Sequence, residues 1–308
     1  MTALLPLLRR RCSGGHTAGA LLARAARGRS ARRGFRAHGQ RSAALRLDSG
    51  ACGLPHPQKR ATGGEDAWFI CDNTVGVADG VGGWARKGID SGEYSRTLMA
   101  SAEHMVTVAT ERPTPLQVLT EAHQNAQCLG SSTACIVQLD DAMLRAINLG
   151  DSGFLLCRLH PDEDARGARK WQIVHETLHQ CHYFNCPYQL GYGANGDTPE
   201  MGEVYELKAQ EGDVIVLGTD GLFDNLYSEQ IASLLDTVLP STQEEHNQLS
   251  MDKIASCIAH TAHEVAKGTK TKTPFAVAAQ QAGYEYLGGK MDDITVVTSL
   301  VTGDWAQK

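Results

Sequence analysis

The 308-residue sequence lacks any apolar run of about 18 residues, the length that a membrane-spanning helix needs, so we predict no membrane span. It also contains no internal repeat. Hydrophobic residues make up 42% and charged residues 21%, which are ordinary values for a globular protein. Since single domains often reach about 200–250 residues, we expect one large domain preceded by a tail, and we expect a monomer.

The first 47 residues contain no Asp, Glu or Lys, but they contain eleven Arg. Residues 48–308 therefore hold 18 basic and 35 acidic residues, a formal net charge of −17. An Arg-rich, acid-free segment with Leu, Ala and Ser is typical of mitochondrial targeting, so residues 1–47 predict import into the matrix. A secretory signal is excluded because the apolar run at 4–8 is too short and no small-residue cleavage site follows it directly. The alternative is a basic arm that binds nucleic acid. The acidic remainder argues against it, and we expect no nucleic-acid partner.

The nine cysteines show no repeated spacing, and their odd number does not suit a closed disulfide framework. Cys71, Cys135 and Cys157 lie inside apolar runs. We therefore expect reduced, mostly buried thiols in a reducing compartment.

The hydrophobic pattern predicts a linker at 48–63, rich in Gly and Pro, and a domain at 64–302. Residues 175–201 show no periodicity, and we interpret them as a long functional loop. Four strands between 133 and 174 predict an antiparallel meander. Further strands are expected at 65–71, 75–79, 203–207, 214–218 and 294–300, and helices at 91–110, 115–129, 228–239, 251–267 and 275–281.

Strands occur in runs and helices in pairs, without regular alternation of strand and helix. This order predicts an α+β fold, with two packed, mainly antiparallel sheets and helix pairs outside them.

Three expected strands carry acids at their ends. The run at 75–79 ends in Asp79 and is followed by Gly80, the run at 214–218 leads to Asp220, and Asp292 precedes the run at 294–300. Mg²⁺ and Mn²⁺ prefer carboxylate and carbonyl oxygens. We therefore predict a two-ion site made by Asp79, the Gly80 carbonyl, Asp220 and Asp292, with Glu65 reaching an ion through water. Two ions about 3.5–4 Å apart activate a bridging water and hold phosphate oxygens in place.

Six ordered segments between Glu65 and Val297 resemble the type-2C, metal-dependent serine/threonine protein phosphatases. The segments are 64–67 (GEDA), 77–83 (VADGVGG), 130–134 (GSSTA), 148–153 (NLGDSG), 219–224 (TDGLFD) and 292–297 (DDITVV). Together with the Arg-rich leader, residues 182–185 (HYFN) and 187–190 (PYQL) resemble the mitochondrial branch related to yeast PTC-seven.

The resemblance implies a four-layer α-β-β-α sandwich with two Mn²⁺ or Mg²⁺ ions per active site. It also implies hydrolysis of phosphoserine and phosphothreonine on mitochondrial phosphoproteins by a metal-activated water. By resemblance Asp79 bridges the ions, Gly80 gives its carbonyl, Asp220 and Asp292 bind the first ion, and Glu65 contacts the second through water. Asp79, Asp220 and Asp292 are thereby the catalytic acids. Nearby acids that would orient ligands or hold a third ion are Asp66, Asp151 and Asp224.

The chain departs from the family pattern at two positions. Val81 stands where many members have a His that protonates the leaving alkoxide, so water or a neighbour such as His182 must supply the proton. Ala61 stands where the family has an Arg that holds phosphate. Lys59 or Arg60 is expected to take its place, although a Lys lacks the bidentate geometry of an Arg.

Three other interpretations compete with this one. Residues 150–153 (GDSG) resemble the nucleophile turn of chymotrypsin-like proteases, with Ser152 as nucleophile. Zinc could be held by a crowded set of four residues, His179, Cys181, His182 and Cys186. Finally, the chain could be a catalytically weak or inactive relative that binds phosphoproteins through the same fold.

Overall fold

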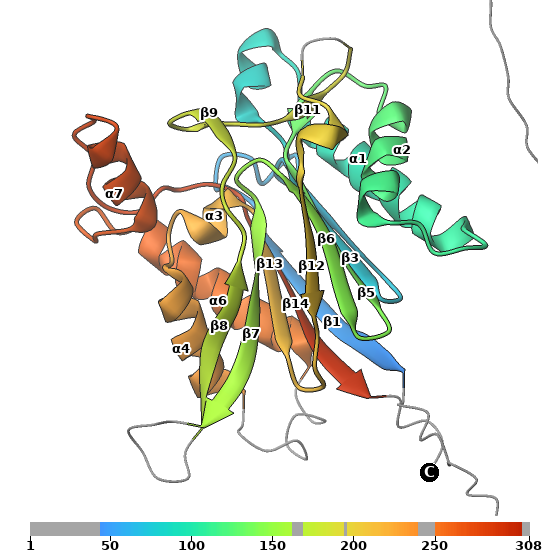
Figure 1. Ribbon diagram of the computed structural model, residues 1–308. Coiled ribbons are helices and arrows are strands. Elements are labelled where there is room, and N and C mark those ends of the chain that lie inside the picture. Colours follow the sequence, from blue (N-terminus) through green and yellow to red (C-terminus); the bar gives the residue numbers. More distant parts are fainter. Residues whose placement is uncertain (1–43, 162–168, 194–195, 240–249, 304–308) are drawn as a thin grey trace, which may run out of the picture. The chain divides into compact units, whose positions relative to one another are not determined.

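The computed structural model describes residues 44–161, 169–193, 196–239 and 250–303 (Figure 1). The chain divides into two units, 1–41 and 42–308, and the described residues belong to the second. Nearly all of the expected targeting segment lies outside the described residues, so its interpretation stays a prediction.

Two five-stranded sheets form the centre of the described unit, with strand orders β1-β14-β13-β7-β8 and β12-β6-β5-β3-β2. Every neighbouring pair in them is antiparallel. The strands of the first sheet are β1 Leu45–Leu54, β7 Gly153–Pro161, β8 Arg169–Glu176, β13 Val214–Gly218 and β14 Ile294–Gly303. Those of the second are β2 Asp66–Cys71, β3 Thr74–Asp79, β5 Ala134–Asp140, β6 Met143–Leu149 and β12 Glu203–Lys208.

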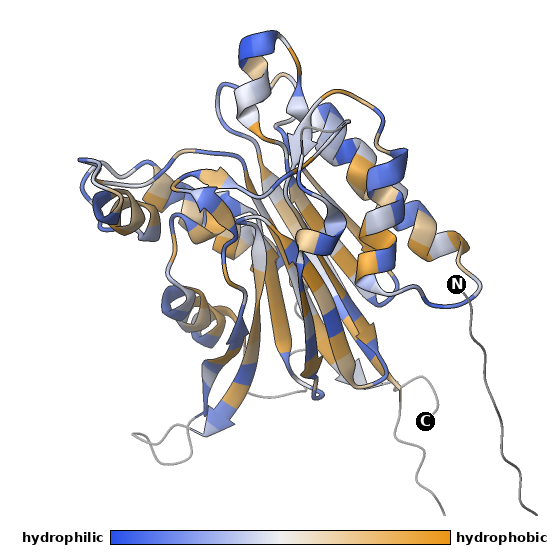
Figure 2. Cartoon of the chain, turned by 45° about the horizontal axis from the view of Figure 1, so that its top comes forward, coloured by the Kyte–Doolittle hydropathy of each residue, from blue (hydrophilic) through white to orange (hydrophobic). Residues whose placement is uncertain are grey.

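Helices cover the outer face of each sheet (Figure 1). Helices α1 Ser91–Val108 and α2 Pro115–Asn125 pack on the second sheet, and α4 Ser228–Val238 and α6 Met251–Ala266 pack on the first. Apolar side chains of both sheets fill the space between them, and the strands are accordingly largely hydrophobic in Figure 2. The structure confirms the predicted α+β sandwich with four layers.

Short elements complete the unit. They are β4 Ser131–Ser132, β9 Cys181–Tyr183, β10 Cys186–Pro187, β11 Leu190–Gly191, α3 Asp220–Phe223, α7 Pro274–Gln281 and two 3₁₀ turns, η1 Gly82–Lys87 and η2 Pro199–Met201. The region 175–201, which we expected to be one long loop, therefore contains a small β9–β10 hairpin and strand β11, which pairs with β4.

Local sequence signals account for the helix starts. Thr114 and Gln117 form a reciprocal capping box at α2, with Pro115 in the first turn. The Asp90 carboxylate accepts a hydrogen bond from the Gly92 amide at the start of α1. The expected helices at 91–110 and 115–129 begin where we predicted them, although both end earlier, at Val108 and Asn125.

The predicted linker at 48–63 is wrong for residues 48–54, because they belong to β1. This strand pairs with β14 along its whole length, from Leu45 opposite Gly303 to Leu54 opposite Ile294. Gly50 and Gly53 interrupt the apolar pattern that is typical of a strand. Both positions nevertheless need glycine, because Asp252 approaches Gly50 and the Trp68 ring approaches Gly53 closely. A Cβ at Gly50 would lie 2.1 Å from the backbone nitrogen of Asp252 in α6. The sandwich therefore begins at Leu45 rather than at residue 64.

The predicted meander between 133 and 174 is also wrong. β5 pairs with β6 and β7 pairs with β8, but β6 and β7 lie in different sheets. The chain crosses between the sheets at Gly150–Ser152, where Gly150 adopts a φ of 107° that other residues rarely reach. Even strand spacing does not reveal such a crossing.

The composition-based expectation for the cysteines is confirmed in part. The eight cysteines among the described residues are all free thiols, but only Cys135 and Cys157 are buried, so the expectation of mostly buried thiols is wrong. None of the helices in this part of the chain is both long enough and apolar enough to cross a membrane.

The packing of β1 generates a stability prediction. We expect Gly50→Ala to lower the free energy of unfolding by about 1–3 kcal/mol, because the new methyl group overlaps the backbone at the start of α6. Thermal denaturation should show a melting temperature several degrees lower. Gly83→Ala is the control, since no heavy atom lies within 4 Å of a Cβ there. Equal melting temperatures for the two variants would contradict the packing of β1.

Candidate metal centre

Adjacent strand ends of the second sheet place three acidic residues together. Asp79 is the last residue of β3 and lies directly opposite Asp66, the first residue of β2. In an antiparallel pair the end of one strand adjoins the start of the other. Glu65 precedes Asp66, and its carbonyl accepts a hydrogen bond from the Gly80 amide at 3.0 Å. The β2–β3 hairpin therefore supplies Glu65, Asp66 and Asp79 at one edge.

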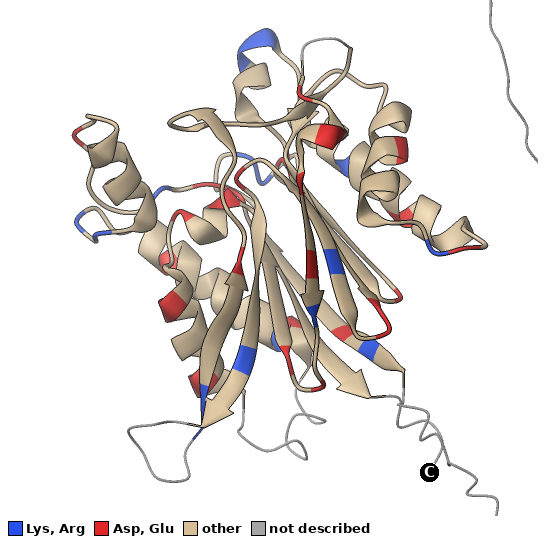
Figure 3. Ribbon diagram, viewed as in Figure 1, with Lys and Arg blue, Asp and Glu red and all other residues tan. Residues whose placement is uncertain are grey.

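The first sheet supplies the remaining acids by the same rule. Asp220 follows β13, and Asp292 precedes β14, which runs antiparallel beside it. Asp151 lies in the crossing before β7, whose first residue pairs with the last residue of β13. A cross-sheet hydrogen bond joins the two groups, since the Thr219 hydroxyl donates to the Asp66 carboxylate at 2.8 Å. Figure 3 shows acidic residues gathered at this end, beside α3.

Gly80 occupies a position that only glycine fits. A Cβ there would lie 2.7 Å from the Glu65 carbonyl oxygen and 2.8 Å from that of Ser91. The turn after Asp79 is further held by the Val81 amide, which donates to the Ser131 carbonyl, and by the Ser91 hydroxyl, which donates to the Val81 carbonyl. The turn is thus fixed, and Val81 adds no ionisable group to it.

The gathered acids repel one another. Burial, and then the charges of neighbouring carboxylates, raise the pKa values of Asp66, Asp79 and Asp151 well above their usual range. Burial and the charge of Asp220 likewise raise the pKa of Asp292. Burial raises the pKa of Asp224 to about 7. A cluster of this kind stabilises a bound cation strongly.

Two lysines lie among these acids. The Lys290 ammonium is 2.5 Å from Asp220, 2.7 Å from Asp224 and 3.4 Å from Asp292. Burial opposes ionisation of the Asp220 carboxyl group, but the nearby Lys290 ammonium outweighs this effect and lowers the pKa of Asp220. Sequence reasoning missed Lys290, because a lone Lys before an acid pair carries no recognisable pattern.

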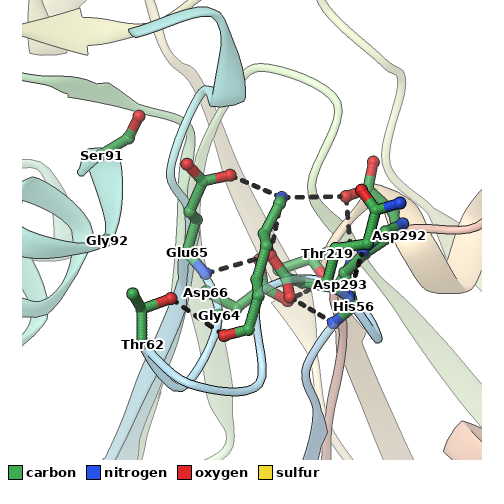
Figure 4. A network of polar contacts seen from close by, with 12 residues as sticks. His56, Thr62, Gly64, Glu65, Asp66, Ser91, Gly92, Thr219, Asp292 and Asp293 are labelled. Atoms are coloured by element: carbon green, nitrogen blue, oxygen red, sulfur yellow. Dashed lines mark hydrogen bonds and ion pairs between the residues drawn. The ribbon is translucent and has the colours of Figure 1, made fainter. Parts of the chain in front are cut away.

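Lys59 occupies the other side of the centre. Its ammonium is 2.5 Å from Glu65, 2.9 Å from Asp293 and 3.5 Å from Asp292. Asp293 also accepts hydrogen bonds from the amides of His56 and Glu65, so one buried carboxylate ties this segment to the start of β14. Figure 4 shows Glu65, Asp292 and Asp293 in this network. Arg60, by contrast, is exposed, and its charge acts on His263 of α6.

The acids fit a hard divalent ion. Within the described residues, four buried carboxylate oxygens have no hydrogen-bond partner: Glu65 Oε2, which is ion-paired with Lys59, and Asp66 Oδ1, Asp151 Oδ1 and Asp220 Oδ1. Buried carboxylates without partners are costly, and oxygens of this kind are the ligands that Mn²⁺ and Mg²⁺ prefer. In the same part of the chain no three Asp, Glu, His or Cys side chains stand in a ready-made metal-binding arrangement, and the ammonium groups of Lys59 and Lys290 contact the acids instead.

The structure does not support the protease hypothesis. Ser152 is fully buried, and its hydroxyl is hydrogen-bonded to the Thr133 hydroxyl at 2.7 Å. A nucleophile must reach substrate, which this hydroxyl does not. The hydroxyl instead connects the crossing between the sheets to β5.

The zinc hypothesis fails as well. Two of its four residues, His182 and His179, have other partners. His182 is bound by Asp197 at 3.0 Å and packs on Tyr188, while His179 packs near Phe223. The β9–β10 hairpin is therefore held by local contacts.

Comparisons with known proteins agree on one family. The chain is 47% identical over 262 residues to "Probable protein phosphatase 2C 80" of Arabidopsis thaliana, covering 84% of this chain and 59% of that protein. It is 37% identical over 308 residues to the human "Protein phosphatase PTC7 homolog", covering 92% and 96% of the two chains. The chain spans little more than half the length of the first two Arabidopsis relatives, 59% and 52%. No family model matches it.

Solved structures share the architecture. The photosystem II phosphatase PBCP superposes with a TM-score of 0.71 at 31% identity, covering 83% of this chain and 99% of that one. The catalytic domain of the serine/threonine phosphatase PstP, solved with two manganese ions, has a TM-score of 0.53 at 15% identity, covering 84% and 99%. The second likeness concerns the fold alone.

The repulsion among the acids generates a metal-binding prediction. We expect Mn²⁺ at about 100 times its Kd to stabilise the protein by about 2.7 kcal/mol, measured as a rise in melting temperature. Asp79→Asn should lose most of this rise. In EDTA the same variant should melt at or above the wild-type temperature, since one repelling carboxylate is gone.

The control for this experiment is Glu264→Gln, which alters an exposed carboxylate paired with Lys267. It should keep the full Mn²⁺ response. If Mn²⁺ does not change the melting temperature of the wild-type protein, the metal centre is ruled out.

Proposed function

Since the chain belongs to the protein phosphatase 2C family of metal-dependent phosphatases, we propose that it removes phosphate from phosphoserine and phosphothreonine in proteins, acting as a monomer. The observation that carries this proposal is the cluster of buried carboxylates, some with unpartnered oxygens, where the two sheets meet. Family membership follows from identities of 37–47% over most of the chain.

We assign each acid of the cluster a role toward two Mn²⁺ or Mg²⁺ ions. Asp79 would serve both ions, the Gly80 carbonyl would be a neutral ligand, Asp220 and Asp292 would hold the first ion, and Glu65 would contact the second through water. Asp66, Asp151 and Asp224 orient these ligands or hold a further ion. When bound, such ions activate water as a nucleophile and neutralise phosphate charge.

The chain's own residues prepare this centre in two ways. Thr219 and Asp293 fix the acids of one sheet against those of the other, so that the ligands are positioned before substrate arrives. Lys59 supplies positive charge beside Glu65, and we propose that it binds the substrate phosphate that the Arg replaced by Ala61 would hold.

Protonation of the leaving alkoxide is the step for which the turn after Asp79 offers no donor, because Val81 is apolar. His182 is engaged by Asp197 and is therefore a poor substitute. We propose that solvent water supplies this proton.

The alternative of a non-catalytic phosphoprotein-binding module is not favoured. A module that only bound phosphate would gain nothing from burying carboxylates that repel both phosphate and one another. The cost of assembling this cluster is understandable if it binds cations.

We expect the full chain to hydrolyse p-nitrophenyl phosphate and phosphothreonine peptides in Mn²⁺ or Mg²⁺, and EDTA to abolish this activity. Asp79→Asn should lower kcat by about 100-fold or more. Ser152→Ala should stay active, because this hydroxyl is buried away from substrate. Full activity in EDTA, or in Asp79→Asn, would refute the mechanism.

The same assay tests the phosphate-binding role of Lys59. Lys59→Gln should raise KM for phosphopeptides about tenfold, whereas Arg60→Gln, in the exposed neighbour, should leave KM unchanged. Equal KM values for the two variants would transfer the role to another residue.

We further propose that the protein acts on mitochondrial phosphoproteins in the matrix. The support is the acid-free, Arg-rich composition of residues 1–47. Fusion of these residues to a fluorescent protein should direct it to mitochondria, and fusion of a version with all eleven Arg changed to Gln should not. Diffuse or plastid fluorescence of the first fusion would overturn the proposal.

A further inference from the structure

Lys290 is a cation held inside the acidic centre. Its side chain is only 18% exposed, and its ammonium contacts three carboxylates, those of Asp220, Asp224 and Asp292. Two of these carboxylates, Asp220 and Asp292, are ligands that we propose for the first divalent ion. Lysine and ion therefore depend on the same acids.

The backbone of Lys290 is held by hydrogen bonds, and its ammonium also lies over an aromatic ring. The Asn225 side chain accepts a hydrogen bond from the Lys290 amide at 3.0 Å and donates to the Lys290 carbonyl at 2.8 Å. The side-chain amide of Asn225 also donates to the Gly221 carbonyl in α3. The Phe275 ring lies 5.2 Å from the ammonium, within the range of a cation–π contact. The hydrogen bonds with Asn225 involve only backbone atoms of Lys290, so its four-carbon side chain can rotate without breaking them.

One ammonium does not neutralise three carboxylates, and it leaves Asp220 Oδ1 without a partner among the described residues. A divalent ion supplies twice the charge and can use both oxygens. An ammonium 2.5 Å from Asp220 and an ion on the same carboxylate would repel each other strongly in this partly buried place. The two cations are therefore alternatives.

We propose that Lys290 is an internal counter-cation, which holds Asp220, Asp224 and Asp292 together in the metal-free protein and moves away from them when the first divalent ion binds. This inference rests on the proposed metal centre. It makes metal loading an exchange of cations rather than the filling of a preformed site. It also predicts opposite effects of removing Lys290, a less stable metal-free protein and tighter metal binding, whereas a purely structural lysine would weaken both.

The test measures Mn²⁺ binding to the full chain by titration calorimetry and the melting temperature in EDTA. Lys290→Gln should lower the Kd for Mn²⁺ at least about tenfold and lower the melting temperature in EDTA by several degrees. Lys290→Arg, which keeps the charge, should restore both values toward those of the wild type. The matched control is Lys87→Gln, because the Lys87 ammonium also lies over an aromatic ring, at 4.5 Å from Trp84, and belongs to an exposed side chain. It should change neither value.

A measurement on the wild type keeps the proposal testable if Lys290→Gln does not fold. An amine-acylating reagent, followed by peptide mass spectrometry, should label Lys290 several times more in Mn²⁺ than in EDTA, because displacement exposes the ammonium. Labelling of Lys87 should be equal in both. Labelling of Lys290 that Mn²⁺ does not raise would overturn the proposal.

The outcomes distinguish failure of the cation exchange from failure of the metal centre. If the wild type binds Mn²⁺ and Lys290→Gln binds it no more tightly, the exchange of cations is refuted and the metal centre stands. If the wild type binds no Mn²⁺, both are refuted.

Discussion

Mutual repulsion among buried carboxylates is the constraint on which the rest of this molecule depends. Asp66, Asp79, Asp151 and Asp220 meet in one place, where burial makes each charge more costly than it would be in water. Such a cluster forms only if the surrounding fold is stable enough to hold it and if cations offset it. The hydrophobic layer between the sheets supplies the first condition, and Lys59 and Lys290 contribute to the second.

The architecture makes this meeting point almost unavoidable once the acids stand at strand ends. Antiparallel pairing brings the end of β3 beside the start of β2, and the end of β13 beside the start of β14. The Thr219–Asp66 hydrogen bond then joins the two sheets at that edge. The cluster therefore depends on the topology, because a change in strand order would separate these acids even if each residue remained.

The sequence predicted what depends on local pattern and missed what depends on distant neighbours. Asp79, Asp220 and Asp292 end or precede strong apolar runs, so we could expect them to lie together, and the apolar periodicity predicted the start of α2 at residue 115. The sequence did not predict strand β1, because Gly50 is typical of a loop in a local pattern. Its reason lies in the close approach of α6, a helix some 200 residues away in the sequence. The sequence did not predict the contacts of Lys290, because folding brings together the acids that it contacts.

Pairing of β1 with β14 has a consequence for how the domain is connected to whatever flanks it. Leu54 pairs with Ile294, next to the acids, whereas Leu45 pairs with Gly303 at the other end of the ladder. Ten residues of strand span roughly 30 Å, so both ends of the domain emerge that far from the centre. The two paired strands therefore place the attachment points at Leu45 and Gly303 roughly 30 Å from the acids.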